Sequence, residues 1–256
     1  LYWLLEKIHG IVQNWGWAIV LLVVLIKAAF YWLNASAYRS MAKMKAINPR
    51  IMEMRERLKS NPQAMQQEMM KIYREEKVNP LGGCFPILIQ IPIFFALYKV
   101  IFVTIELRHA PFFGWLNDLA APDSSSMYNL FGLLPWDGPV TGSLTHMIFI
   151  GILPIILGIT MWMQQKLNPA PTDPIQQQIF AWMPWVFMFM LGSFASGLVV
   201  YWITNNMITF IQQYAIMRSH GHKPDIFGNI RSSFKKKPAA AAAANTPTAP
   251  KGKAKK

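Results

Sequence analysis

The chain contains one cysteine, Cys84, and few charged residues for a length of 256. A single thiol excludes an internal disulfide framework and a metal site built from several cysteines, and we interpret Cys84 as a small core-filling side chain. Charged residues make up 14% of the sequence and hydrophobic residues 53%, gathered into long blocks. A soluble domain of this size does not need such blocks, so the composition favours a membrane protein.

Sequence signatures of catalysis are missing as well. There is no Walker A motif, no dinucleotide-binding glycine fingerprint and no HExxH zinc motif. The histidines lie at or beyond the ends of the apolar blocks, where no serine and aspartate join them at one depth: His9, His109, His146, His220 and His222. We therefore expect a protein that is not an enzyme and that uses no cofactor or metal.

Five apolar blocks predict membrane-spanning helices, because about 20 apolar residues are needed to cross a bilayer. The predicted spans are residues 16–38, 83–104, 144–166, 178–193 and 196–217. The expected fold class is an all-α integral membrane protein with five transmembrane helices. A cytoplasmic helical hairpin at about 40–78 and an outer loop at about 105–143 complete a core of residues 1–217, and a tail of residues 218–256 follows.

The distribution of basic residues predicts the orientation. Residues 39–77 contain ten Lys/Arg against five Asp/Glu, and residues 218–256 contain ten against one, whereas residues 106–142 contain a single basic residue. The positive-inside rule then places the chain's N-terminus outside and its C-terminus in the cytoplasm. The tail has too few apolar residues to form a core, and its lysines are expected to attract anionic lipid or ribosomal RNA: Lys235, Lys236, Lys237, Lys251, Lys253, Lys255 and Lys256.

The basic region after the first span has the pattern of two amphipathic helices. Asn48-Pro49 and Asn61-Pro62 are predicted helix starts, with proline at the first helical position. One interpretation is that the apolar stripes only hold the two helices together. The alternative is an adaptable, methionine-rich contact surface made by Met41, Met44, Ile51, Met54, Leu58, Met65, Met69 and Ile72.

A lysine lies in the middle of the first apolar block. Lys27 is ten residues from Trp17 and twelve from Arg39, so neither membrane interface is close. Because a charge at bilayer depth costs about 3 kcal/mol on insertion scales, we expect Lys27 to face other helices or water. The five blocks contain no Asp or Glu to neutralise it. A cationic groove that attracts acidic residues of a passing polypeptide is the resulting hypothesis.

Other polar side chains in the spans could line the same groove. Lys27 and Tyr31 are four residues apart and are expected to share a helix face, as are the polar residues of the last span. Interhelical hydrogen bonds are the alternative role for Gln90, Thr160 and Asn205. The candidate groove residues are Lys27, Tyr31, Gln90, Thr160, Gln164, Tyr201, Asn205 and Thr209.

The segment NPLGGCFPILIQIPIF at residues 79–94 strongly resembles the YidC/Oxa/Alb3 membrane protein insertases. Further matches are SMAKM at 40–44, QEMM at 67–70, Asp173-Pro174 and SGLVVY at 196–201. The resemblance implies a five-helix core around a hydrophilic groove that is closed outward in the bacterial inner membrane. It also implies insertion of nascent membrane proteins, alone or with the Sec translocon, and contact with ribosomes, without specific DNA binding.

Two departures from the family pattern concern the groove and the outer loop. The groove cation in the family is usually arginine, and Lys27 keeps the charge but lacks the planar guanidinium fork. Residues 124–143 form a longer outer stretch than in enterobacterial members. The chain begins at Leu1 without an initiator Met, so we expect a fragment or processed form, and Gram-negative members carry an earlier transmembrane helix and a large periplasmic domain.

Two other classes of protein would also explain parts of the sequence. A secondary transporter or channel would account for a charge within a helical bundle, although five spans and no visible internal repeat disfavour it. A passive scaffold for ribosomes or translocon partners would need the hairpin and tail but not Lys27. Solute flux would support the first class, and dependence on the tail alone would support the second.

Overall fold

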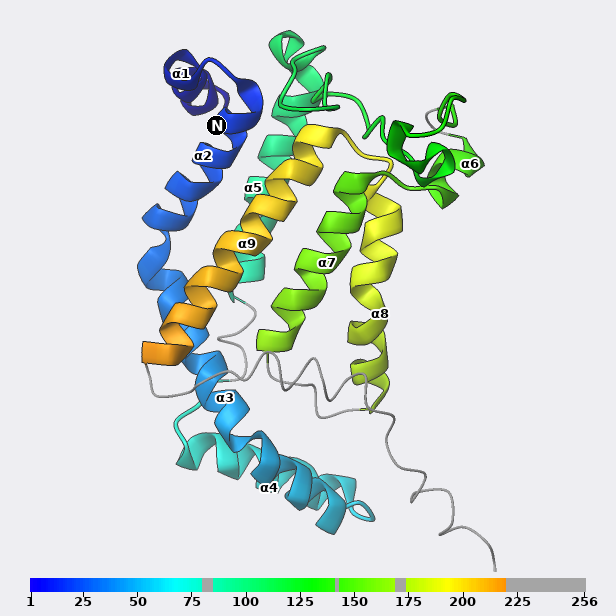
Figure 1. The fold of residues 1–256 in the computed structure, drawn as a ribbon. Helices are drawn as coiled ribbons and strands as arrows, with labels where there is room; N and C mark the ends of the chain where they lie inside the picture. The colour runs from blue at the N-terminus through cyan, green and yellow to red at the C-terminus, as the bar shows by residue number, and fades with distance from the viewer. Residues whose placement is uncertain (80–84, 141–142, 169–173, 220–256) are drawn as a thin grey trace, which may run out of the picture. The chain divides into compact units, whose positions relative to one another are not determined.

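The structure is a computed structural model that describes residues 1–79, 85–140, 143–168 and 174–219. Within these ranges every regular element is a helix and none is a strand (Figure 1), which confirms the all-helical fold class. The lysines of the predicted basic tail, residues 80–84 of the glycine-containing motif and Asp173 lie outside the described residues.

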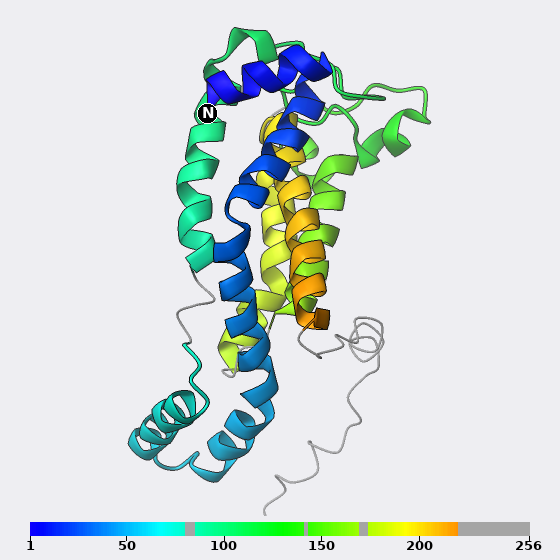
Figure 2. The ribbon, with the colours of Figure 1, turned by 90° about the vertical axis from the view of Figure 1, so that its left-hand side faces the viewer.

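The first two helices fold back on each other. Helix α1 (Tyr2–Val12) ends at Gln13, whose φ is +55°. Helix α2 (Trp15–Ala29) is preceded by Asn14, whose side chain accepts a hydrogen bond from the backbone N–H of Trp17 at 3.1 Å. This is ordinary N-capping, and it sets the direction of α2. Figure 2 shows α1 lying across the end of the bundle at which α2 begins.

Helix α3 (Tyr31–Arg57) follows α2 after a bend of 71° at Phe30. The predicted helix start at Asn48-Pro49 is wrong, because α3 runs through Pro49 without interruption. Proline removes one backbone hydrogen bond but does not have to end a helix when packing on both sides holds it. Here Ile47 and Ile51 are both buried against helix α4 (Pro62–Glu75). The predicted start at Asn61 is confirmed, since its side chain accepts from Ala64 N at 3.2 Å.

Four further helices have their axes in the same general direction in Figures 1 and 2: α5 (Phe85–Val103), α7 (Ile152–Leu167), α8 (Pro174–Leu191) and α9 (Ser196–Ser219). Helix α9 contacts α2, α3, α5 and α7, so it is the central helix of the bundle. Helices α7 and α8 approach closely at Gly158, where an added Cβ would lie 2.8 Å from Sδ of Met188. A small residue is therefore required at this crossing.

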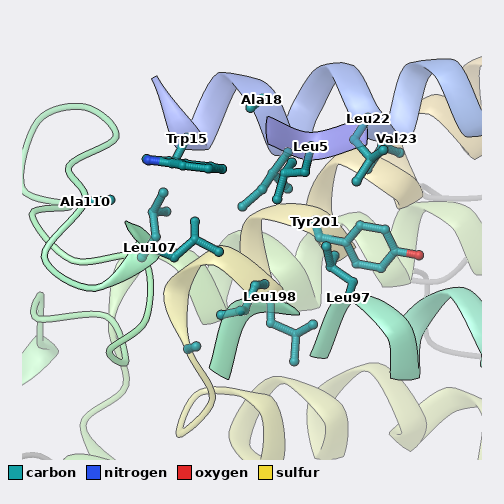
Figure 3. Packing of buried hydrophobic residues seen from close by; sticks show 14 of the residues in the cluster. Leu5, Trp15, Ala18, Leu22, Val23, Leu97, Leu107, Ala110, Leu198 and Tyr201 are labelled. Atoms are coloured by element: carbon teal, nitrogen blue, oxygen red, sulfur yellow. The ribbon is translucent and has the colours of Figure 1, made fainter. Parts of the chain in front are cut away.

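The main core cluster lies between α1, α2, α5 and α9 (Figure 3). Tyr201 of α9 lies among Leu22 and Val23 of α2 and Leu97 of α5, and its hydroxyl points in the direction in which α2 continues past Val23. The hydroxyl of Tyr201 thus lies at the edge of the apolar cluster and points toward the last turn of α2.

By length and composition, one helical stretch of the described residues could cross a membrane: Leu144–Leu167. The bent pair α2 and α3 would add a second if it is counted as one span, and the apolar stretch Leu88–Val103 is shorter. The five spans therefore stay a prediction.

The outer segment, residues 104–151, contains the short helices η2 (Ile105–Leu107), η3 (Met127–Gly132) and α6 (Leu144–Ile148). Its backbone caps the start of α9: the carbonyl of Ala121 accepts from Ser196 N at 2.7 Å, and that of Leu119 accepts from Gly197 N at 2.8 Å. These contacts satisfy two N–H groups that a helix start leaves without intrahelical partners.

The same segment caps α7 with a buried carboxylate. Asp123, 2% exposed, accepts from Leu153 N with Oδ2 at 2.8 Å. Its Oδ1 accepts from Trp115 Nε1 at 3.0 Å and from Ser125 N at 2.9 Å. The hydroxyl of Ser125 donates to Oδ1 at 2.8 Å and accepts from Ile152 N at 2.8 Å. A negative charge at a helix N-terminus is favourable, so Asp123 fastens the outer segment to α7.

Candidate functional site

Lys27 continues the buried face of α2. Residues 18, 19, 22 and 23 of this face pack in the core cluster, and Lys27 follows one turn later with 8% exposure. None of the ion pairs in the described part of the chain includes Lys27. The charge is thus enclosed by helices without a carboxylate partner among those residues, which is costly unless water or another molecule solvates it.

Tyr31 does not share the environment of Lys27, which corrects the expectation of a common helix face. The break at Phe30 lies between the two residues, so the four-residue spacing of a continuous helix does not apply across it. Tyr31 is 44% exposed, whereas Lys27 is buried. The sequence contained no glycine or proline at Phe30 that would have indicated the bend.

Gln90 and Tyr201 meet between α5 and α9. The side-chain amide of Gln90 donates a hydrogen bond to the hydroxyl of Tyr201. This is the interhelical role that the sequence left open for Gln90, and it joins two candidate residues that are far apart along the chain.

The hydroxyl of Tyr201 supports a prediction about stability. Tyr201→Phe should lower the free energy of unfolding by about 1 kcal/mol, because the Gln90 amide loses its partner within the bundle. Thermal unfolding of detergent-solubilised protein would measure the change. In a Gln90→Leu background the same substitution should cost less, and Tyr98→Phe on the outer side of α5 is the matched control. An equal loss in both backgrounds would contradict the contact.

Thr160 pairs with Asn206, which is not among the candidate groove residues predicted from the sequence. The side-chain amide of Asn206 donates to Oγ1 of Thr160 at 3.4 Å. Two turns further along α9, the side-chain amide of Gln213 donates to Oδ1 of Asn168 at 3.0 Å. Both pairs join α9 to α7. The polar residues of α9 therefore belong to two faces, and the spacing of Tyr201, Asn205, Thr209 and Gln212 in the sequence indicates only one of them.

Several buried polar atoms near the C-terminal ends of α7 and α9 have no hydrogen-bond partner among the described residues. They are Oε1 of Gln212, Oε1 of Gln213 and Nε2 of Gln165. Asn205 is buried and Gln164 half-buried on the same two helices. Because an unpaired polar atom is costly in an apolar layer, this cluster is suited to hold water or a polar guest.

The hairpin formed by α3 and α4 turns most of its apolar stripe inward. Ile51, Met54 and Ile72 are buried, and Met44, Leu58, Met65 and Met69 pack against them in part. Met41 packs instead on a cluster with Ala35, Tyr38 and Ile216. Within the hairpin, the methionines with exposed side chains are Met52 and Met70, which lie off the predicted stripe. The stripe residues thus hold the hairpin together, and their role as a contact surface stays a prediction.

The salt bridges of the hairpin are exposed to solvent and add little stability. Arg50 contacts Glu75 and Glu76, each at 3.1 Å, and Arg57 contacts Glu68 at 4.0 Å, all in solvent-exposed positions. Burial lowers the pKa of Lys45, whose ammonium nitrogen has no hydrogen-bond partner within the described ranges. Met70, Lys71 and Arg74 line an open hollow on α4 together with Gln63, Gln66 and Gln67.

Packing inside the hairpin leads to a second prediction. Ile51→Ala should destabilise the hairpin by about 2–5 kcal/mol, because Ile51 is almost fully buried between the two helices. Hydrogen exchange of the amides in residues 47–78 would show faster opening of this unit while the bundle remains protected. Met52→Ala on the exposed side is the matched control. Unchanged exchange in Ile51→Ala would contradict the packing.

The helices enclose a lysine and a cluster of amides, and they turn large apolar side chains outward, among them Leu88, Phe95, Phe102, Trp182 and Val186. This inside-out distribution is that of an integral membrane protein with a polar interior. The chain belongs to the 60Kd inner membrane protein family, whose model matches residues 7–223.

Similar proteins support the family assignment. A membrane protein insertase YidC from Jannaschia sp. is 65% identical over 237 residues, which is 93% of this chain and 38% of that protein. The insertase of the same name from Roseobacter denitrificans is 64% identical over 237 residues, covering 93% and 39%. This chain thus spans about two fifths of the length of these relatives.

A solved structure shares the fold. The crystal structure of an active YidC insertase with its first transmembrane domain resolved matches with a TM-score of 0.58 and 24% identity. The match covers 83% of this chain and 44% of that chain.

Proposed function

We propose that this chain is the helical core of a membrane protein insertase, which inserts nascent proteins into the inner membrane and helps them fold. The observation that carries the proposal is that the helices enclose both the charge of Lys27 and a cluster of polar side chains on α7 and α9, while their outer surfaces are apolar. Such an interior lowers the cost of holding a polar peptide segment in the low-dielectric layer. The names of the relatives support the same function.

In this proposal the chain crosses the membrane five times, with its N-terminus periplasmic and its C-terminus cytoplasmic. The groove contains Lys27, Gln90, Thr160, Gln164, Tyr201, Asn205 and Thr209, with Tyr31 at its edge. When no substrate is bound, water solvates Lys27 and the side-chain amides that lack a hydrogen-bond partner. The hairpin and the basic tail receive nascent chains and contact the ribosome, the Sec translocon and anionic lipid. No nucleotide is consumed, because the free energy comes from the substrate's own apolar segment entering the bilayer.

Insertion by the purified full chain in nucleotide-free proteoliposomes tests this function. The substrate is a small one-span protein with an acidic outer flank, and protease protection of that flank measures insertion. We expect protection well above that in protein-free liposomes. Solute flux without insertion would favour a transporter or channel. Activity that appears only when ribosomes or translocon are added would favour a scaffold.

A further inference from the structure

The part of the outer segment formed by residues 127–140 and 143–149 combines internal hydrogen bonds with many exposed apolar side chains. Its backbone and polar groups bond to each other: Phe131 N donates to Ser126 O at 2.8 Å, and Leu134 N donates to Asn129 O at 3.1 Å. The indole N–H of Trp136 donates to the carbonyl of Tyr128 at 3.1 Å. Internal hydrogen bonds therefore hold residues 126–136 together.

The apolar side chains of the same loop point outward. Leu133 is 85% exposed and Val140 is 79% exposed, and the exposed set further includes Met127, Tyr128, Leu130, Phe131, Trp136, Leu144, Met147 and Ile148. Asp137 is the one charged residue between positions 124 and 149. So much exposed apolar surface on an outer loop marks an interaction site.

The backbone is strained at the centre of this surface. Leu130 and Phe131 have φ values of 48° and 58°, in the left-handed region that bulky residues rarely adopt. Both side chains are nevertheless exposed. Two features are therefore unfavourable in water: the left-handed backbone and the exposure of two large apolar side chains. Burial of these side chains in an apolar medium would offset the cost.

We infer that this loop, residues 127–140 and 143–149, is an interfacial anchor that embeds its apolar side chains in the outer leaflet beside the bundle. Three observations favour lipid as the occupant. Figures 1 and 2 show α6 and the loop projecting sideways at the end of the bundle where α7 begins. The exposed apolar surface continues along α7 through Ile156 and Ile159. Tyr128 and Trp136 are half-exposed aromatic residues of the kind found at membrane interfaces.

The absence of basic residues defines the kind of lipid contact. No Lys or Arg occurs between positions 109 and 165. Binding through the charge of anionic headgroups is therefore not available to this loop, and insertion of apolar and aromatic side chains is the remaining attraction. A bilayer of neutral lipid should suffice.

Site-specific fluorescence in neutral vesicles tests the anchor, which rests on the proposed membrane embedding. The full chain with Cys84→Ser receives one cysteine by Leu133→Cys or Val140→Cys and carries a polarity-sensitive dye. Asn117→Cys, also exposed in the outer segment, is the matched control, and Ile159→Cys on α7 is the membrane control. The probes are phosphatidylcholine vesicles with nitroxide-labelled acyl chains and, separately, aqueous iodide.

We expect nitroxide lipid to quench the dyes at positions 133 and 140 several-fold more than the dye at 117, which iodide should quench best. Quenching of 133 and 140 by iodide as strong as that of 117, with position 159 still quenched by lipid, would overturn the anchor alone. A blue-shifted dye at 133 that neither agent quenches would show that protein covers the loop and would also overturn it. Failure of lipid to quench position 159 would contradict the membrane embedding itself.

Discussion

Lys27→Ala should reduce insertion of proteins with acidic outer flanks about tenfold, while proteins with neutral flanks insert nearly as well as with the wild type. The reason is the position of the charge: Lys27 is buried on the inner face of α2 and has no carboxylate partner among the described residues. Its attraction for a passing carboxylate at 4 Å is worth about 4 kcal/mol at an effective dielectric constant of about 20, part of which is lost to desolvation. Protease protection in proteoliposomes would measure both substrates in parallel.

Two further variants separate charge from other effects of the substitution. Lys27→Arg keeps the charge and should retain most activity, since the proposed groove needs a cation and not the geometry of an ammonium. Lys99→Ala removes a lysine from the exposed side of α5 and should leave insertion unchanged. Equal insertion of acidic-flank substrates by wild type and Lys27→Ala would remove Lys27 from the mechanism.

Asp123→Asn should lower the free energy of unfolding by about 3 kcal/mol, although it replaces only one carboxylate oxygen by an NH₂ group. The carboxylate accepts from Leu153 N with one oxygen and from Trp115 and Ser125 with the other. An asparagine must place its NH₂ group against one of these sets of donors. Thermal unfolding would measure the loss, and hydrogen exchange at Ile152 and Leu153 would locate it at the start of α7.

Gly151→Ala tests the same cap from the opposite side. A Cβ at Gly151 would lie 2.5 Å from Oδ2 of Asp123 and 2.7 Å from the carbonyl oxygen of Ser125, so the carboxylate would have to move. We expect a loss of stability similar to that in Asp123→Asn and the same faster exchange. Gly138→Ala is the matched control, because its nearest neighbours would be 3.8 Å away. Asp137→Asn, at an exposed carboxylate, should also have no effect. Protection at Leu153 that survives both Asp123→Asn and Gly151→Ala would contradict the cap.

Local patterns in the sequence predicted the helices well where the signal lies within a few residues. Asn61 and Pro62 begin α4 as expected, and the described parts of the apolar blocks are mainly helical, with breaks at Phe30 and at residues 149–151. The bend at Phe30 was not predictable, because neither glycine nor proline marks it. Pro49 misled in the opposite sense, since burial of Ile47 and Ile51 against α4 outweighs the hydrogen bond that proline removes.

The polar interior was predicted in part. Spacing along α9 identified Tyr201, Asn205 and Thr209, but the partners of its other polar face lie on α7, more than forty positions away, as Asn206 and Thr160 show. In the sequence, nothing but its charge distinguishes Asp123. Its role depends on donors from residues 115, 125 and 153, which tertiary folding alone brings together. Local periodicity carries no information about such long-range contacts.

Accessibility of the interior to water is the most direct test of the account. In a Cys84→Ser background, Asn205→Cys on α9 would be treated with a membrane-impermeant maleimide in vesicles that expose the cytoplasmic side. Leu157→Cys, in the packed core of α7, and Ile159→Cys, on its outer side, are the controls. We predict that position 205 reacts several-fold faster than either control and is protected when a substrate is engaged. Reaction at 205 as slow as at 157 would show a dry interior and contradict the hydrated groove.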